Sequence, residues 1–240
     1  MKNKGFTLAE VLIVLAVLGF IALLVLPAII SNVQKNQVGP ALTKAIATLE
    51  TAHAIMINER EMNNITEGCR LLEDGHIPLY TQPYISNCFE PYIMKTIGAA
   101  KENVDVTYDN YNESGVALNA NSTYSKYTTK SGITYIFPQG GLFGSITDEK
   151  GMIPFFVDIN GINKKPNILG KDLFRLVIAV NKSGGDVIPL GGKYFREFFD
   201  SPVYYWENNC SSNTPINRIT GDTCGGSVID NGGKVIYPWK

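Results

Sequence analysis

One carboxylate lies at the edge of a long apolar run near the N-terminus. Glu10 is followed by 20 residues without a charge, from Val11 to Ile30. A charged residue at the centre of a membrane helix costs roughly 2.5–3.5 kcal/mol on translocon scales, and less near an end. Two explanations stay open. The carboxylate lies in interfacial water near a helix N-terminus, where negative charge is favoured, or it is held for a cation that it meets only after assembly.

The apolar run after Glu10 is long enough to span a membrane. A helix of this length extends about 30 Å, the thickness of one bilayer hydrocarbon core. Lys2 and Lys4 precede the run, so the N-terminus is expected to stay cytoplasmic and the residues after 30 to lie across the membrane. Residues 31–34, Ser-Asn-Val-Gln, offer no small-residue cleavage site. Any processing signal therefore lies before the run, which would stay in the mature protein.

Residues 4–10, Lys-Gly-Phe-Thr-Leu-Ala-Glu, and the apolar run after them resemble the class III signal of type IV pilins and type II secretion pseudopilins. The resemblance implies cleavage after Gly5 by prepilin peptidase and N-methylation of the new terminus, Phe6. It also implies that Glu10 neutralises the Phe6 amine of a neighbouring subunit. Gly19 and Pro27 fall where this family often has a helix-weakening pair.

The same resemblance implies partners and a location. The expected partners are prepilin peptidase, other pilin or pseudopilin subunits, the inner-membrane assembly platform and the lipid bilayer. The chain is expected to cross the inner (cytoplasmic) membrane once, with its N-terminus cytoplasmic, and then to enter a periplasmic or extracellular filament.

Four cysteines follow the apolar run, all in the part expected to be exported. An even number in an oxidising compartment favours disulfides, and three pairings are possible. Cys69–Cys88 and Cys210–Cys224 are preferred because each pair closes a local loop among Gly, Asn, Pro and Ser; the alternative is four free buried thiols. None forms a C-x-x-C pair, and the two histidines are not spaced as partners in a zinc site. The segment from Cys210 onward also resembles the C-terminal disulfide loop of type IV pilins.

A polar segment after one expected strand could supply hard oxygen ligands for calcium. The candidate ligands are Asp158, Asn160, Asn163 and Asp172. The spacing is not that of an EF-hand, because the glycine comes too early and no Glu closes the loop. A polar Asn-Gly turn explains the segment without any metal. Calcium-stabilised loops occur in pseudopilins, so the resemblance favours the calcium alternative slightly; no other cofactor is expected.

The segment from Tyr194 to Trp206 is dense in aromatic residues. Aromatic side chains carry large buried areas, so these residues are expected in the core. Tyrosine and tryptophan also favour interfaces, which leaves a subunit contact or a ligand-binding patch as the alternative.

The spacing of apolar residues predicts the scaffold. One long broken helix is expected from about residue 7 to about residue 61, with a bend at Gly39-Pro40. Its second half carries an apolar stripe for packing on a sheet, with His53 as a packed core residue: Leu42, Ile46, Leu49, His53 and Met56. Strands are expected at 133–137, 155–159, 173–180 and 186–190, the last an edge strand because of Pro189. Asn160-Gly161 is a hairpin turn signal.

The expected fold is α+β: a long N-terminal helix, membrane-spanning in its first half, packed on an antiparallel sheet in a pilin-like arrangement. The expected divisions are a leader peptide (1–5), a transmembrane or filament-core helix (6–30), the soluble half of the helix (31–61), a connecting region (62–130), and the antiparallel sheet with the C-terminal disulfide loop (131–240).

Composition and motifs narrow the function. Removing the leader with its two lysines takes the formal net charge from −1 to −3, and the longest basic runs are two residues, so nucleic-acid binding has no support. The chain has no catalytic motif, which argues against an enzyme. The prediction is a structural subunit of a type IV pilus-like or type II secretion pseudopilus filament. The alternative is a minor or tip subunit that binds a sugar, protein or surface.

Overall fold

The computed structural model describes most of the chain: residues 7–62, 90–98, 101–104, 123–139, 145–147, 150–164, 167–181, 184–200 and 205–239. The chain divides into two compact units, Met1–Gln37 and Val38–Lys240, which are treated separately below. The predicted leader (1–5), Phe6, Cys69 and Cys88 lie outside the described residues.

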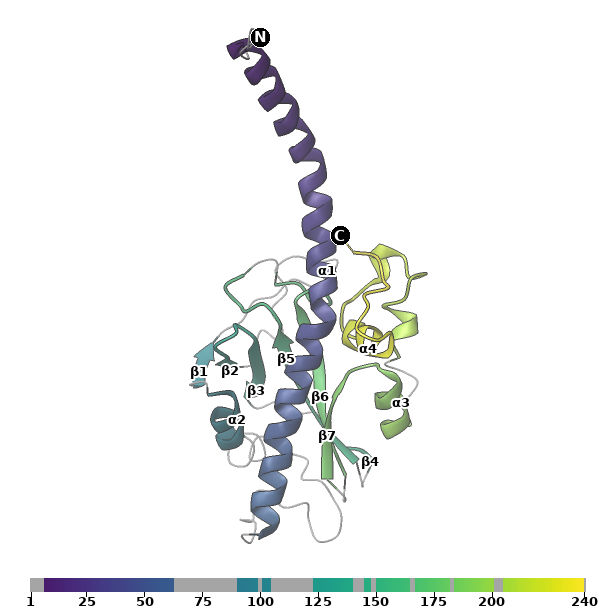
Figure 1. The fold of residues 1–240 in the computed structure, drawn as a ribbon. Helices are drawn as coiled ribbons and strands as arrows, with labels where there is room; N and C mark the ends of the chain where they lie inside the picture. Colours follow the sequence, from purple (N-terminus) through teal and green to yellow (C-terminus); the bar gives the residue numbers. More distant parts are fainter. Residues whose placement is uncertain are drawn as a thin grey trace. The chain divides into compact units, whose positions relative to one another are not determined.

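Figure 1 shows the order of the elements along the chain. The helices are α1 (Leu8–Met62), α2 (Glu90–Ile97), α3 (Lys193–Phe199) and α4 (Cys224–Asp230), with short 3-10 turns η3 (Trp206–Asn208) and η4 (Ile216–Arg218). The strands are β1 (Lys101–Val104), β2 (Thr123–Thr128), β3 (Thr134–Gln139), β4 (Ser145–Thr147), β5 (Lys150–Asp158), β6 (Leu173–Asn181) and β7 (Gly184–Pro189).

The first unit consists of the N-terminal part of α1. No side chain between residues 7 and 37 is buried, although most of these residues are apolar. Helix α1 contains an 18-residue window apolar enough to cross a membrane, and none of that window is buried. An all-round apolar surface of this kind is typical of a helix whose surroundings are lipid or other helices.

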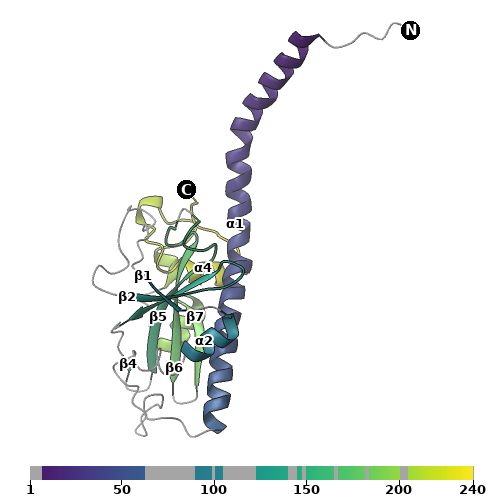
Figure 2. The same cartoon turned by 90° about the vertical axis from the view of Figure 1, so that its left-hand side faces the viewer.

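The second unit begins with the amphipathic part of α1. All five residues of the predicted stripe are buried, including His53 at 2% exposure. These side chains recur at steps of three and four, so they share one face of the helix. Figure 2 shows this part of α1 running alongside one face of the sheet. The prediction of a helix half that packs on a sheet is confirmed.

The sheet is antiparallel, with the strand order β1-β2-β3-β5-β6-β7, and β4 pairs with β5 beside this path. The core of the second unit consists of the stripe on α1 and of the sheet side chains that face α1. These sheet residues are Tyr127, Tyr135, Phe137, Phe155, Val157, Phe174, Leu176, Ile178 and Val187. They alternate along each strand with residues of the other face, as a pleated sheet requires. This α+β arrangement confirms the predicted fold class and is consistent with a pilin-like fold.

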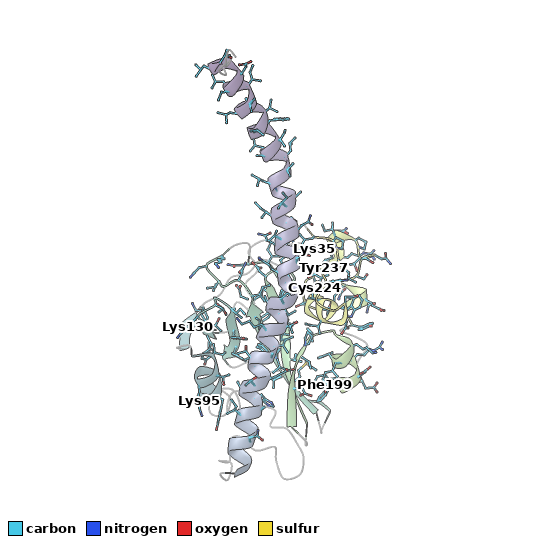
Figure 3. The ribbon with its side chains drawn as sticks, in the orientation of Figure 1. Lys35, Lys95, Lys130, Phe199, Cys224 and Tyr237 are labelled. Atoms are coloured by element: carbon cyan, nitrogen blue, oxygen red, sulfur yellow. A yellow bond between two sulfur atoms is a disulfide. The ribbon has the colours of Figure 1, made fainter. Side chains whose placement is uncertain are left out.

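The opposite face of the sheet is also covered. Helix α3 places Phe195 and Phe199 against side chains of β6 and β7, and Figure 3 labels Phe199 on this helix. A smaller cluster joins the same face to the segment before β6: Ile136, Phe156, Leu169 and Leu173. The second unit therefore has helices on both faces of its sheet, which the sequence did not indicate.

Four expected strands are present as β3, β5, β6 and β7, and β7 is the predicted edge strand. The sheet also includes β1 and β2, which lie within residues 62–130, the predicted connecting region. Strand β2, Thr-Tyr-Ser-Lys-Tyr-Thr, is too polar to stand out by composition, yet Tyr127 on it is fully buried. Its residues do not alternate between apolar and polar, so periodicity carried no signal either.

Two predictions about backbone breaks are wrong. Helix α1 is continuous through Gly39-Pro40, so the predicted break of the helix is wrong, whereas a bend at this pair stays a prediction. The buried residues Val38 and Leu42 lie on both sides of the pair. Asn160-Gly161 does not form a tight hairpin: β5 and β6 do pair, but residues 159–172 connect them.

Candidate functional site

Glu10 has a partner within its own chain. Its Oε2 atom accepts hydrogen bonds from the backbone N–H of Thr7 and from the Thr7 hydroxyl, both at 2.8 Å. The backbone N–H of Glu10 donates in turn to Thr7 Oγ1 at 3.3 Å. Thr7 directly precedes the first helical residue, so the two residues form a reciprocal capping box that satisfies otherwise free N–H groups at the start of α1.

The sequence reasoning identified Glu10 but missed Thr7. The signal was present, because Ser or Thr followed three residues later by Glu is the signature of a capping box. The structure thus places the carboxylate at the helix N-terminus, where the helix dipole also favours it. Pairing of Glu10 with a Phe6 amine stays a prediction, since Phe6 lies outside the described residues.

Gly19 and Pro27 both lie within the unbroken helix α1. A Cβ atom added to Gly19 would meet no atom within 4 Å. The glycine is therefore not required by any close contact with the residues that the structure describes. Glycine and proline both lower the intrinsic stability of a helix interior, by about 1 and 3 kcal/mol relative to alanine. A helix-weakening role for the pair is compatible with this placement and stays a prediction.

The connection after β5 brings together three of the four candidate calcium ligands. Asp158 Oδ1 accepts N–H bonds from Asn160 and Gly161 at 3.1 and 2.7 Å. Asp172 Oδ2 accepts from Asn160 Nδ2 at 3.2 Å. The fourth candidate, Asn163, is exposed on the same connection.

Asp172 organises the other end of this connection. Its two carboxylate oxygens accept the backbone N–H groups of Ile168 and Asn167 at 2.6 and 2.7 Å. Burial raises the pKa of Asp172, while these hydrogen bonds and the one from Asn160 act in the opposite direction. The Asp172 carboxylate thus accepts the backbone hydrogen bonds that a neighbouring strand would accept in a sheet.

The candidate ligands engage N–H donors as they are arranged, and calcium binding by them stays a prediction. Three of the four carboxylate oxygens of Asp158 and Asp172 already face N–H donors, whose positive ends would repel a cation. Among the described residues, no group of three or more His, Cys, Asp or Glu side chains could hold a metal ion. Asn160 Oδ1 and Asn167 Oδ1 are buried and accept no hydrogen bond. The hydrogen bonds form the polar turn that the sequence offered as the alternative.

The C-terminal segment contains the predicted disulfide between Cys210 and Cys224, with Cα atoms 5.1 Å apart. Both cysteines are fully buried. Ser227 Oγ donates to the Cys210 carbonyl at 2.7 Å, and Tyr237 Oη donates to the Gly170 carbonyl at 2.6 Å. Figure 3 labels Cys224 and Tyr237 on this segment. The second predicted pair, Cys69–Cys88, lies outside the described residues.

The aromatic segment divides between core and surface. Phe195 and Phe199 are buried beneath the sheet, as the core interpretation predicts. Tyr194 is 48% exposed and donates a hydrogen bond to Asp186 at 2.7 Å. Trp206 Nε1 donates to Asp230 Oδ2 at 2.6 Å, so its polar end is satisfied within the chain.

Comparison with known families supports the N-terminal assignment. Residues 1–26 match the model of the prokaryotic N-terminal methylation motif. No curated protein and no solved structure matches the chain. The matched segment includes the predicted cleavage position, the capping box and most of the exposed apolar surface of α1. Residues 1–26 of this chain therefore carry the class III prepilin signal of type IV pilins and pseudopilins.

Proposed function

We propose that this protein is a structural subunit of a type IV pilus-like or type II secretion pseudopilus filament. The observation that carries the proposal is the exposed apolar half of α1, most of which lies within the methylation motif. Exposed apolar surface of this extent marks a membrane or protein interaction site. The motif and the apolar helix together indicate membrane anchoring, and a filament core of packed helices would cover the same surface.

In this proposal, prepilin peptidase cleaves between Gly5 and Phe6. The peptidase must approach the backbone closely, and glycine has no side chain to obstruct it. Gly5→Leu should leave an uncleaved precursor in the inner membrane, whereas Asn3→Leu in the same leader should be processed normally. Mass spectrometry of the N-terminal peptide measures both. An unmodified Met1 on filament-borne protein would rule the proposal out.

Assembly in this proposal depends on the charge of Glu10. In a packed helical core an unpaired carboxylate or amine is costly, and breaking one side of a buried pair typically costs about 3–5 kcal/mol. Pairing with the Phe6 amine of a neighbouring subunit would remove both penalties. It would also set the register between subunits that the assembly platform adds.

Two substitutions separate this charge from the capping box. Glu10→Ala removes both, whereas Glu10→Gln retains a side chain able to complete a capping box but carries no charge. We expect both variants to insert in the membrane and both to lose filaments. Filament yield is measured beside abundance in the membrane fraction. Normal filaments from Glu10→Gln would show that capping, and not ion pairing, is the role of this residue.

The alternative is a minor or tip subunit that binds a ligand. Tyr194 favours it, because it is the large apolar side chain of the second unit that the described residues leave exposed. Stoichiometry separates the two functions: a major subunit dominates sheared filaments, and a tip subunit is rare in them. Quantitative mass spectrometry of purified surface filaments measures this ratio.

A further inference from the structure

Helix α1 passes from exposed to buried at one residue. Val38 is the first buried residue along α1, and Gly39 after it is buried as well. A Cβ atom added to Gly39 would overlap the carbonyl oxygen of Gly233 and lie 2.6 Å from its Cα. The two backbones therefore touch, and only glycine at position 39 allows this contact.

Gly233 is held in place by the end of α4. The N–H groups of Gly232 and Gly233 donate to the carbonyls of Ile229 and Val228 at 3.1 and 2.8 Å. Gly232 and Gly233 have φ angles of 65° and 82°. These bonds form a Schellman motif, which ends a helix in a defined geometry. The motif presents the Gly233 carbonyl to α1.

The other end of α4 begins at the disulfide. Cys224 is the first residue of α4 and is bonded to Cys210. Between its two ends, the helix is fixed laterally as well. A Cβ atom on Gly226 would overlap the backbone nitrogen of Gly192, and Asp230 Oδ2 accepts hydrogen bonds from Lys193 N at 2.7 Å and from Trp206 Nε1. Helix α4 is thus pinned at its start, along its side and at its end.

We propose that α4 is a strut through which the Cys210–Cys224 disulfide fixes the point where the packed part of α1 begins. Helices open most readily from ends and exposed segments that lack tertiary contacts. Opening that spreads from the polar segment 31–37 of α1, none of whose residues is buried, would stop where α4 holds Gly39. The disulfide acts on α1 although neither cysteine belongs to that helix. The inference rests on the fold of the second unit and does not require the proposed filament function.

Amide hydrogen exchange on the full chain in detergent micelles tests the strut. Gly39→Ala should accelerate exchange at residues 42–46 by about tenfold, because the added methyl group displaces Gly233. Gly19→Ala is the matched control: it makes the same change in the same helix but meets no atom within 4 Å. It should leave exchange at residues 42–46 unchanged. Strand β6 is the internal reference for unfolding of the whole unit.

A double-mutant cycle tests the link to the disulfide. Replacing Cys210 and Cys224 by serine should accelerate amide exchange at residues 42–46 more than amide exchange in β6. Adding Gly39→Ala to the serine variant should accelerate exchange at residues 42–46 little further, because both changes release the same contact. If the two effects multiply, or if Gly39→Ala behaves like Gly19→Ala, the strut does not exist. If Gly39→Ala fails to fold, the serine variant decides: equal acceleration at β6 and at residues 42–46 overturns the proposal.

Discussion

Residues 8–37 and residues 38–62 of α1 belong to one helix, yet their apolar side chains meet different surroundings. Leu18 is 57% exposed, whereas Leu49 has no exposed surface. Residues 11–30 of the first half are apolar on all sides, and the second half is apolar on the single face that meets the sheet. One secondary structure therefore serves two environments, and the pattern of side chains around the helix axis distinguishes them.

The two halves of α1 gain free energy from different partners. Burial of apolar surface stabilises a fold only when the chain itself removes that surface from water. The second half contributes to the stability of its unit, whereas the first half can gain the same free energy only from lipid or from other subunits. The predictions below compare the halves, from the largest expected effect to the smallest.

The largest difference is expected from one substitution made in each half. Leu49→Ala should lower the free energy of unfolding of the second unit by about 2–5 kcal/mol, because it leaves a cavity against the sheet. Leu18→Ala should change it by less than about 0.5 kcal/mol. Denaturant unfolding in detergent, followed by tryptophan fluorescence, measures both. Similar losses from the two variants would mean that the first half is packed after all.

The packed half of α1 lies on a sheet in which Asp172 holds the β5–β6 connection by accepting its backbone N–H groups. Asp172→Asn should cost about 1–3 kcal/mol at neutral pH, because one buried N–H group loses its acceptor. Separately from these hydrogen bonds, the raised folded-state pKa of Asp172 means that burying its charge lowers wild-type stability as the pH rises from the unfolded-state pKa through the folded-state pKa. The variant should lack this pH dependence.

Thermal unfolding across acidic and neutral pH measures the effect of Asp172. The same experiment with added calcium tests the metal alternative. We expect no change, because the carboxylates already accept N–H bonds. A calcium-dependent rise in melting temperature that Asp172→Asn abolishes would show that calcium binds at these ligands.

Tyr135 joins the packed half of α1 to β3, because its Oη donates to the Ala45 carbonyl at 3.2 Å. Tyr135→Phe should cost about 1 kcal/mol. Burial raises the pKa of Tyr135 from 10.0 to about 12. Its stabilising contribution is therefore complete below pH 10 and lost as the pH rises through 12. Wild type and variant should converge in stability over this interval, as alkaline unfolding curves can measure; parallel curves would contradict the assignment.

The exposed half has its own capping box as its local stabilising device. Thr7→Val removes the hydroxyl with little change of shape and should destabilise the helix start by about 0.5–1 kcal/mol. Amide exchange at residues 8–11 in micelles should accelerate about three- to fivefold, while the second unit is unaffected. Thr51→Val, which removes a hydroxyl that donates to the Ala47 carbonyl of its own helix, is the control. An equal effect at both positions would argue against a cap.

Features that depend on neighbours in sequence were predictable. The apolar run, the buried stripe of α1, four strands and the local disulfide all follow from periodicity or short spacing, and the structure contains each of them. The capping box was equally readable from Thr7 and Glu10. Predictions failed where a local signal competed with packing: Gly39-Pro40 did not break the helix, and Asn160-Gly161 did not close a hairpin.

The sequence by itself determined that the chain carries a prepilin signal, that one helix has two kinds of surface, and that the remainder forms an α+β fold. Only the tertiary structure decided what Gly39, Asp172 and Asp230 do. Gly39 admits the backbone of Gly233, Asp172 replaces the missing partners of a loop, and Asp230 holds the start of α3. The roles of Gly39 and Asp230 depend on groups distant in sequence, and that of Asp172 depends on the irregular turn before it. Helical or strand periodicity carries no information about such pairs.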